Sequence, residues 1–199
     1  MVKDKVLFLI SAYNSSEYTK LNVEYLKRIT DVDIEILVVD DCSSDDTVEW
    51  CKENNVKVFE KKKGRGNTHS WNMAYKYFKE NEEFTYLVNA NHDIVVPNGA
   101  LSQLIETQKR WPGTTVCPMG DKRGVGHAPV QFIGQYFDGF ANASTDYNNT
   151  QQIQDGLIET RKNLKKAKDL YMIDPIRMKH FNGFLFMHSR EICKYERPD

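Results

Sequence analysis

The sequence lacks the features that mark several specialised classes of protein. Its four cysteines lie far apart and form no CxxC pair, which argues against a zinc site and a disulfide scaffold and favours a reducing compartment. No apolar run approaches the roughly 20 residues of a membrane-spanning helix. The first such run, residues 6–10, is far shorter than the core of a signal peptide. These absences predict a cytoplasmic protein without a transmembrane segment.

The sequence also lacks an excess of charge of either sign. With 27 Lys and Arg against 28 Asp and Glu, the formal net charge is -1, so no overall field attracts nucleic acid or an anionic membrane. Any anion must therefore meet a local site. There is no internal repeat and no linker rich in Pro, Gly or Ser. A length of 199 residues with 40% hydrophobic residues then predicts a single domain, residues 1–199.

Short apolar runs alternate with helical patterns through the first hundred residues. The runs cover residues 5–10, 34–39, 56–59 and 84–88, and the helical patterns cover residues 18–28, 45–54 and 68–80. This alternation predicts an α/β fold, with a mostly parallel sheet flanked by helices. Ligands of such sheets bind beyond the carboxyl ends of the strands. The second half predicts a helix over 97–110, a strand over 115–119, an amphipathic helix over 151–170 and otherwise irregular structure.

The acidic segment after the second apolar run admits two interpretations. Ser43, Ser44 or Asp45 is expected to cap the helix that follows. Capping leaves Asp40 unexplained, because an acid at the tip of a buried strand needs hydrogen-bond donors to offset its desolvation. A nucleobase imide or a ribose hydroxyl is one suitable donor.

The basic segment 61–66 lies between a predicted strand and a predicted helix. A solvated charge run is one interpretation of its sequence, Lys-Lys-Lys-Gly-Arg-Gly. The two glycines also allow a diphosphate to approach the backbone near a helix N-terminus. It is not a P-loop, because the Gly-Lys-Ser/Thr spacing is missing.

A third polar segment, Asn91-His92-Asp93, follows the fourth apolar run. A turn rich in Asn and Asp is the plainer interpretation. The alternative is a divalent ion held by Asp93 with amide, imidazole or water ligands, bridging two phosphates of a nucleotide. Magnesium uses few protein ligands together with substrate phosphate, and manganese also tolerates imidazole.

Taken in order, these segments resemble the inverting family-two glycosyltransferases with the GT-A fold. Residues 11–14, Ser-Ala-Tyr-Asn, resemble the family's P-x-Y-N turn with Ser11 in place of proline, and residues 37–44 resemble its V-D-D-x-S motif. Residues 66–72 keep the family's Gly and Asn spacing, with Ser70-Trp71 where Ala-Arg is usual. Residues 87–97 fall on the D-x-D segment, closest to the N-N-D-V-V-V-P of rhamnosyltransferase-like members. Residues 182–190 resemble the G-x-x-x-x-x-R-R segment that walls the acceptor side.

The resemblance implies a Rossmann-like GT-A domain that transfers a sugar from a UDP- or dTDP-linked donor to an acceptor hydroxyl with inversion, assisted by Mn2+ or Mg2+. It implies a nucleotide-sugar-binding half over about 1–101 and an acceptor-side half over about 102–199. A glycan, a lipid-linked molecule or a protein is the expected acceptor. Asp93 is the expected metal ligand. Asn91, His92 and His188 are further candidate ligands. The expected nucleotide-sugar contacts are Ser11, Ala12, Tyr13, Asn14, Asp40, Asp41, Lys63, Gly66, Asn72, Asn91 and His92.

Inverting transfer also needs a carboxylate base. In the family this residue belongs to a Glu-Asp pair shortly after the G-x-x-x-x-x-R-R segment, and no such pair occurs before Asp199. Asp174, Glu191, Glu196 and Asp199 are positional candidates for the base. Alternatively, the sequence is a catalytic domain cut from a longer chain.

Two competing functions remain at this point. A sugar nucleotidyltransferase on a related sheet carries a glycine-rich loop after its first strand, and residues 11–16 contain no glycine. A non-catalytic nucleotide-sugar-binding or interaction module of the same fold is the second alternative, and the missing base keeps it open.

Overall fold

The computed structural model describes residues 4–96, 98–118 and 185–195 of the chain. Along these residues the elements are β1 (Lys5–Ala12), α1 (Ser16–Leu26), β2 (Asp33–Asp40), α2 (Thr47–Glu53), β3 (Lys57–Glu60), α3 (Gly66–Glu80), β4 (Tyr86–Asn91), α4 (Ala100–Arg110), β5 (Thr115–Val116), β6 (Leu185–Ser189) and the 3-10 helix η3 (Arg190–Tyr195). The helix predicted over 151–170 lies outside the described residues. No helix within the described ranges is long and apolar enough to cross a bilayer.

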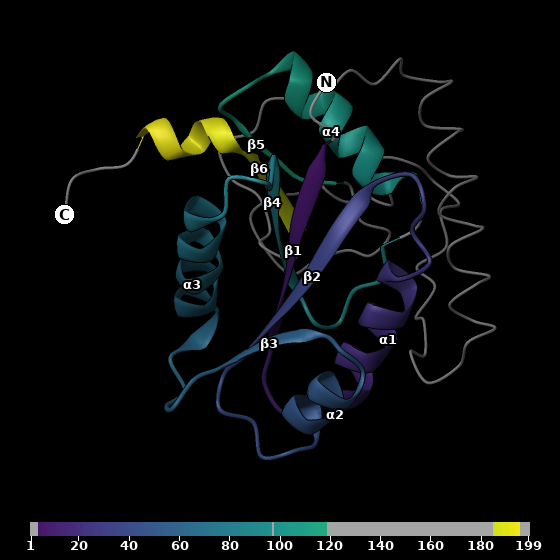
Figure 1. Cartoon of the computed structure of the whole chain (residues 1–199), viewed down its shortest axis with the longest axis vertical. Coiled ribbons are helices and arrows are strands. Elements are labelled where there is room, and N and C mark those ends of the chain that lie inside the picture. Colours follow the sequence, from purple (N-terminus) through teal and green to yellow (C-terminus); the bar gives the residue numbers. More distant parts are fainter. Residues whose placement is uncertain (1–3, 97, 119–184, 196–199) are drawn as a thin grey trace, which may run out of the picture. The chain divides into compact units, whose positions relative to one another are not determined.

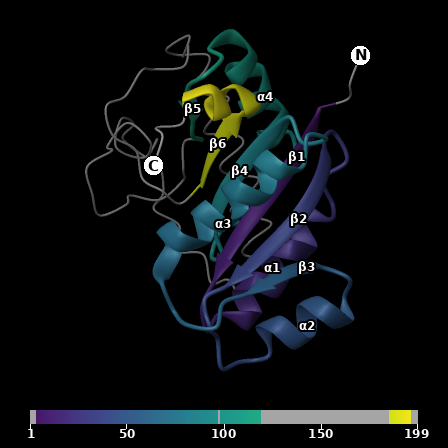
Figure 2. The ribbon, with the colours of Figure 1, turned by 60° about the vertical axis from the view of Figure 1, so that its left-hand side comes forward.

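Six strands form one mixed sheet in the order β3-β2-β1-β4-β6-β5. β3, β2, β1 and β4 are parallel to their neighbours, whereas β6 pairs antiparallel with β4 and β5 pairs antiparallel with β6. Figure 2 shows these strands side by side, with β6 beyond β4. The predicted α/β fold with a mostly parallel sheet is therefore confirmed.

Two apolar layers cover the two faces of the sheet. Because β1 lies between β2 and β4, seven of its eight residues are buried, and successive side chains enter opposite layers. One layer joins Phe8 and Val88 to α1, α2 and α4. The other joins Leu9 and Leu87 to Phe78 of α3. Figure 1 shows α3 on one side of the sheet and α1 and α4 on the other.

One predicted boundary was wrong in a way that matters for the site. The fourth strand was expected to end at residue 88, but β4 continues to Asn91. Asn89 is therefore a strand residue, and only 2% of it is exposed. The amide side chains of Asn89 and Asn91 mislead a pattern based on apolar residues, because strand pairing with Leu9 and Ser11 of β1 decides where β4 ends.

Candidate functional site

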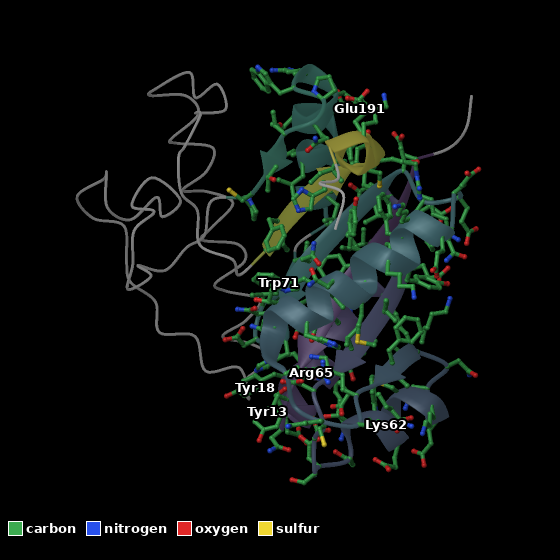
Figure 3. All side chains as sticks on the ribbon, turned by 90° about the vertical axis from the view of Figure 1, so that its left-hand side faces the viewer. Tyr13, Tyr18, Lys62, Arg65, Trp71 and Glu191 are labelled. Atoms are coloured by element: carbon green, nitrogen blue, oxygen red, sulfur yellow. The ribbon has the colours of Figure 1, made fainter. Side chains whose placement is uncertain are left out.

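The turns that follow four parallel strands lie along one edge of the sheet. Ala12 pairs with Asp40, Asp40 pairs with Glu60, and Ser11 pairs with Asn91. The carboxyl ends of β1, β2, β3 and β4 therefore meet, as the sequence predicted. Figure 3 shows Tyr13, Tyr18 and Arg65 at this end of the molecule.

The turns after β1 and β2 are joined by hydrogen bonds. Asn14 adopts a left-handed φ of 44°, and its Oδ1 accepts from the backbone N–H of Ser44 at 2.8 Å. The backbone N–H of Asn14 donates to Ser43 Oγ at 3.0 Å, and that of Ser16 donates to Asp45 Oδ2 at 2.9 Å. This pairing leaves the ring of Tyr13 exposed at 57%, so an aromatic face is presented to solvent beside the turn.

Asp40 is buried at the tip of β2 and receives its hydrogen bonds from within the chain. Its carboxylate accepts from the backbone N–H of Ser43 at 2.9 Å and from the Ser43 hydroxyl. These donors offset the desolvation of a side chain whose residue is 2% exposed. Ser43 thus stabilises Asp40 rather than capping α2, whose first turn is bonded by Asp45 through Thr47. Contact of Asp40 with a nucleoside stays a prediction.

Asp41 binds the segment that connects β3 to α3. Its carboxylate accepts from Lys61 Nζ at 2.7 Å and from the backbone N–H groups of Arg65 at 2.7 Å and Gly66 at 2.8 Å. Burial by itself would raise the pKa of Asp41, but these three donors outweigh it and hold the pKa below its ordinary value. Gly66 has a φ of 75°, a conformation that suits glycine.

Only part of the segment 61–66 is therefore available to bind a diphosphate. The protein's own Asp41 carboxylate already occupies two N–H groups at the start of α3 and the ammonium of Lys61. Of the basic side chains in this segment, those of Lys62, Lys63 and Arg65 are exposed. Binding of a diphosphate by Lys63 stays a prediction, and Lys61 serves the fold instead.

Buried polar side chains also line the first half of α3, where it covers the sheet edge. The Ser11 hydroxyl donates to Asn67 Oδ1 at 2.9 Å and lies 3.1 Å from Ser70 Oγ. Trp71 packs edge-on against Phe186, with ring centroids 5.1 Å apart. Among the described residues, the buried polar atoms on this side without a hydrogen-bond partner include His69 Nδ1, Trp71 Nε1, Asn89 Oδ1 and Asn91 Oδ1. Asn67, Ser70 and Asn89 were not among the predicted site residues, although an amide inside an apolar run is a visible signal.

The segment Asn91–Asp93 fits a divalent ion that takes most of its ligands from a nucleotide and water. Asp93 is exposed, and Asn91 Oδ1 is a buried acceptor without a partner. The described ranges contain no cluster of three or more His, Cys, Asp or Glu side chains suited to a metal. Carboxylate and carboxamide oxygens are ligands that Mg2+ and Mn2+ accept, with substrate phosphates completing the shell. The donor set thus agrees with an ion that binds together with its nucleotide.

The structure does not bring His188 to this segment. His188 pairs with Leu87 on β4, four positions before Asn91, which is about 13 Å along a strand. Its Nδ1 lies 3.1 Å from the Thr115 hydroxyl. Burial lowers the pKa of His188 to about 4, which agrees with a neutral, half-buried ring. The expectation that His188 joins a metal site with Asp93 was wrong, because β6 runs antiparallel and carries His188 away from the carboxyl edge.

Two further expectations fail for the same reason. Glu191 and Arg190 follow β6, whose last residue, Ser189, pairs with Tyr86 at the start of β4. They therefore lie at the amino edge of the parallel strands, and Figure 3 shows Glu191 at the opposite end from Tyr13. Glu191 therefore lies away from Asp93, in a position that does not suit a catalytic base for the site, and Arg190 lies at the same amino edge.

The remaining predicted residues divide into two groups. Ala12 is buried at the end of β1, and Asn72 is exposed on α3, so neither contradicts its expected place near the donor. Asp174, Glu196 and Asp199, the other candidates for the base, lie outside the described residues. Their roles stay predictions.

Comparison with known proteins identifies the family. Residues 8–192 match the model of the family described as "Glycosyl transferase family 2". The chain belongs to glycosyl transferase family 2. No curated protein matches the chain in sequence. The membership confirms the resemblance to family two.

Solved structures with a similar fold include two relevant proteins. One is TarS of S. aureus, residues 1–349: TM-score 0.51, 21% identity, with 62% of this chain and 39% of that chain covered. The TarS complex with UDP aligns with the same TM-score at 22% identity, covering 62% of this chain and 38% of that chain. The other is the mannosyltransferase PcManGT of Pyrobaculum calidifontis in complex with GDP-Man and Mn2+: TM-score 0.59, 17% identity, with 96% and 46% covered.

These likenesses establish the fold of this family-2 chain. At such identities they support the GT-A arrangement of strands and helices. The chain spans less than half the length of each of these solved structures.

Proposed function

We propose that the chain is a glycosyltransferase that moves a sugar from a nucleotide sugar to an acceptor hydroxyl, with inversion and with the assistance of Mn2+ or Mg2+. The observation that carries the proposal is the meeting of four strand-end turns at one edge, with an exposed Asp93 two residues after Asn91, whose buried Oδ1 has no partner among the described residues. Membership of family 2 supports the reaction class. The relatives solved with UDP and with GDP-Man and Mn2+ support a nucleotide-sugar donor and a divalent metal.

The residues at the edge divide the task of holding the donor. Tyr13, exposed beside the Asn14 turn, offers a ring against which a nucleobase can stack. Asp40 is placed to accept from a ribose hydroxyl or a base imide once Ser43 yields one of its two donors. Lys63 and Arg65 are exposed cations beside the start of α3 and complement the charge of the diphosphate.

Departure of the nucleoside diphosphate is the step that most needs charge stabilisation. A divalent ion, when bound, supplies Lewis-acid stabilisation of that leaving group. Within the chain, Asp93 would hold the ion, and Asn91 would contribute a neutral oxygen. One carboxylate is enough only when phosphates supply further ligands, so metal and nucleotide should bind cooperatively.

A second candidate function has an observation in its favour. Glu191, the one candidate base among the described residues, lies at the wrong edge of the sheet. A nucleotide-sugar-binding module without catalysis would need no base. The two functions share the donor site and differ in turnover.

The test measures thermal stability with UDP-, dTDP- and GDP-linked sugars, each with and without Mn2+. A ligand at about a hundredfold its dissociation constant stabilises by about 2.7 kcal/mol, so the midpoint should rise with at least one donor and rise further with Mn2+. Asp93→Ala should remove the metal-dependent part. Glu82→Ala, an exposed acid in the turn before β4, is the matched control and should keep it.

Turnover separates the two candidate functions. Release of free sugar or transfer to an acceptor supports the enzyme, and metal-dependent binding without either supports the module. If no nucleotide sugar shifts the midpoint, both proposals are wrong.

A further inference from the structure

Helix α1 contacts the backbone of the Asn91–Asp93 segment through one buried amide. Asn22 is fully buried, at 0% exposed. Its Nδ2 donates to the carbonyl oxygen of Asn91 at 3.2 Å and to that of His92 at 3.4 Å. A single carboxamide therefore ties two consecutive peptide groups at the point where the chain leaves β4.

Two contacts of His92 hold the same segment from the same side. His92 Nδ1 lies 3.2 Å from the carbonyl oxygen of Ser11. Because a carbonyl oxygen can only accept, this contact places the ring proton on Nδ1. The ring of Tyr18, one turn before Asn22 on α1, lies 6.2 Å from the ring of His92 between centroids. The backbone before Asp93 is thus fixed by α1 and β1 together.

Stability of α1 alone does not explain an asparagine at position 22. Asparagine is a weaker helix former than leucine, and Asn22 Oδ1 is buried without a hydrogen-bond partner. An unpaired buried polar atom costs free energy. Its apolar neighbours on α1, Val23 and Leu26, are buried in the core without such a cost. The hydrogen bonds to the Asn91 and His92 carbonyls offset this cost in free energy.

We infer that Asn22 is a positioning residue, which holds the Asn91–Asp93 segment in the backbone conformation that binds the metal and the diphosphate. The inference rests on the proposed function. Among residues 4–96, 98–118 and 185–195, Asp93 has no hydrogen-bond partner, so its carboxylate is directed by the backbone that precedes it. Groups behind a metal ligand orient it, and their loss weakens metal binding. Asn22 acts through the main chain of its neighbours and does not touch the ion.

The test compares Asn22→Asp with Thr19→Val in the full chain. The aspartate keeps the shape of the side chain but replaces the donating NH2 with an acceptor facing two carbonyl oxygens. Asn22→Ser is a second variant, in case the aspartate prevents folding. Thr19 lies one turn earlier on α1, is also fully buried, and its hydroxyl has no hydrogen-bond partner among the described residues, so Thr19→Val changes a buried polar atom that makes no hydrogen bond to the segment.

Two measurements are made on each folded variant. Hydrogen exchange of the amides of residues 91–95 should be about tenfold faster in the Asn22 variants than in the wild type or Thr19→Val. Mn2+ titrations followed by electron paramagnetic resonance, with saturating UDP or GDP, should give a dissociation constant raised about tenfold or more. UDP or GDP binding without metal should change little, because the Asn22 amide donates to the Asn91 and His92 carbonyls and not to the turn at Asn14.

Unchanged exchange at residues 91–95 would overturn the inference, and so would faster exchange with unaltered Mn2+ affinity. An equal loss of Mn2+ affinity in Thr19→Val would assign the effect to α1 as a whole and would also overturn it. Failure of the wild type to bind Mn2+ with either nucleotide would instead contradict the proposed function. The exchange measurement would still decide whether Asn22 holds the segment.

Discussion

At the residue scale, the ion pair of Asp41 with Lys61 combines burial with charge. The carboxylate and the ammonium are 2.7 Å apart, and their side chains are 12% and 2% exposed. Removing one partner of such a pair leaves an uncompensated charge in a site of low dielectric. The other donors of Asp41, at Arg65 and Gly66, would not neutralise the ammonium of Lys61.

Asp41→Asn is therefore expected to lower the free energy of unfolding by about 3 kcal/mol, measured by urea denaturation at pH 7. Lys61→Met should cost a similar amount, and the double variant should cost less than the sum of the two. Asp46→Asn, which breaks the exposed pair with Lys20, is the control and should leave the midpoint unchanged. Additive costs in the double variant would contradict the coupling.

The same pair affects stability in acid. Because the pKa of Asp41 is lower in the folded chain than its ordinary value of 3.8, its contribution is present at neutral pH. It is lost as the pH falls below about 4. Asp41→Asn should flatten this part of the acid profile.

The lowered pKa of His188 is expected to cause a second loss of stability, at milder acidity. Burial lowers its pKa from 6.5 to about 4 in the folded chain, so between these values the unfolded chain binds a proton that the folded chain does not. Stability should fall by up to about 3 kcal/mol as the pH drops from 7 to 4. His188→Gln, which retains a polar side chain beside Thr115, should reduce this slope in melts recorded across that range. An unchanged slope would show that the ring takes up a proton in place.

At the residue scale, the sequence predicted where the acidic side chains lie but not which groups they bind. Asp40 and Asp93 could be placed at the carboxyl edge because each lies close behind a visible apolar run. That Ser43 binds Asp40 and Lys61 binds Asp41 could not be predicted, since hydrogen bonding depends on side-chain geometry that spacing does not encode. Asn22 was missed because its partners are backbone carbonyls, which leave no trace in a motif.

At the scale of elements, Arg190 connects η3 to the end of α3. Its Nε donates to the Phe84 carbonyl, and one terminal nitrogen lies 2.7 Å from the carbonyls of both Phe78 and Asn81. Its guanidinium also lies 4.3 Å from the centre of the Phe78 ring. The last carbonyls of a helix have no partner within the helix, and here a residue far along the chain supplies one.

Arg190→Lys should lower the free energy of unfolding by about 2–3 kcal/mol, because an ammonium cannot reproduce the planar fork of donors or its stacking on a ring. Denaturation followed by circular dichroism measures the loss. Lys194→Arg, an exposed change on the same 3-10 helix, should be neutral. Equal stability of Arg190→Lys and the wild type would mean that water replaces the hydrogen bonds of the guanidinium without a loss of stability.

The elements of the first half were predictable because each is local. Period and length placed β1 to β4 and α1 to α4 within a few residues of their observed bounds. The role of residues 182–190 was not predictable in the same way. A five-residue strand does not reveal its direction, and antiparallel pairing of β6 with β4 moved Arg190, Glu191 and His188 away from the site.

For the molecule as a whole, the position of β6 limits how far the first hundred residues can fold independently. β6 lies between β4 and β5 in the sheet, although it comes near the end of the sequence. Its residues Leu185, Phe186 and Met187 are buried. The sheet that presents Asp93 is therefore completed only after the chain has returned from beyond Pro118.

Two shortened chains test this dependence, one ending at residue 184 and one ending at residue 195. They differ only in β6 and η3. Burial of the three apolar side chains contributes roughly 5–8 kcal/mol, comparable to the total stability of a typical domain, and removal of β6 also leaves the edge of β4 unpaired. The chain ending at 195 should melt cooperatively and bind nucleotide like the full chain. The chain ending at 184 should show no cooperative transition in thermal melts followed by circular dichroism and should aggregate. A cooperative melt of the chain ending at 184, within a few degrees of the longer one, would show that the rest of the sheet folds without β6.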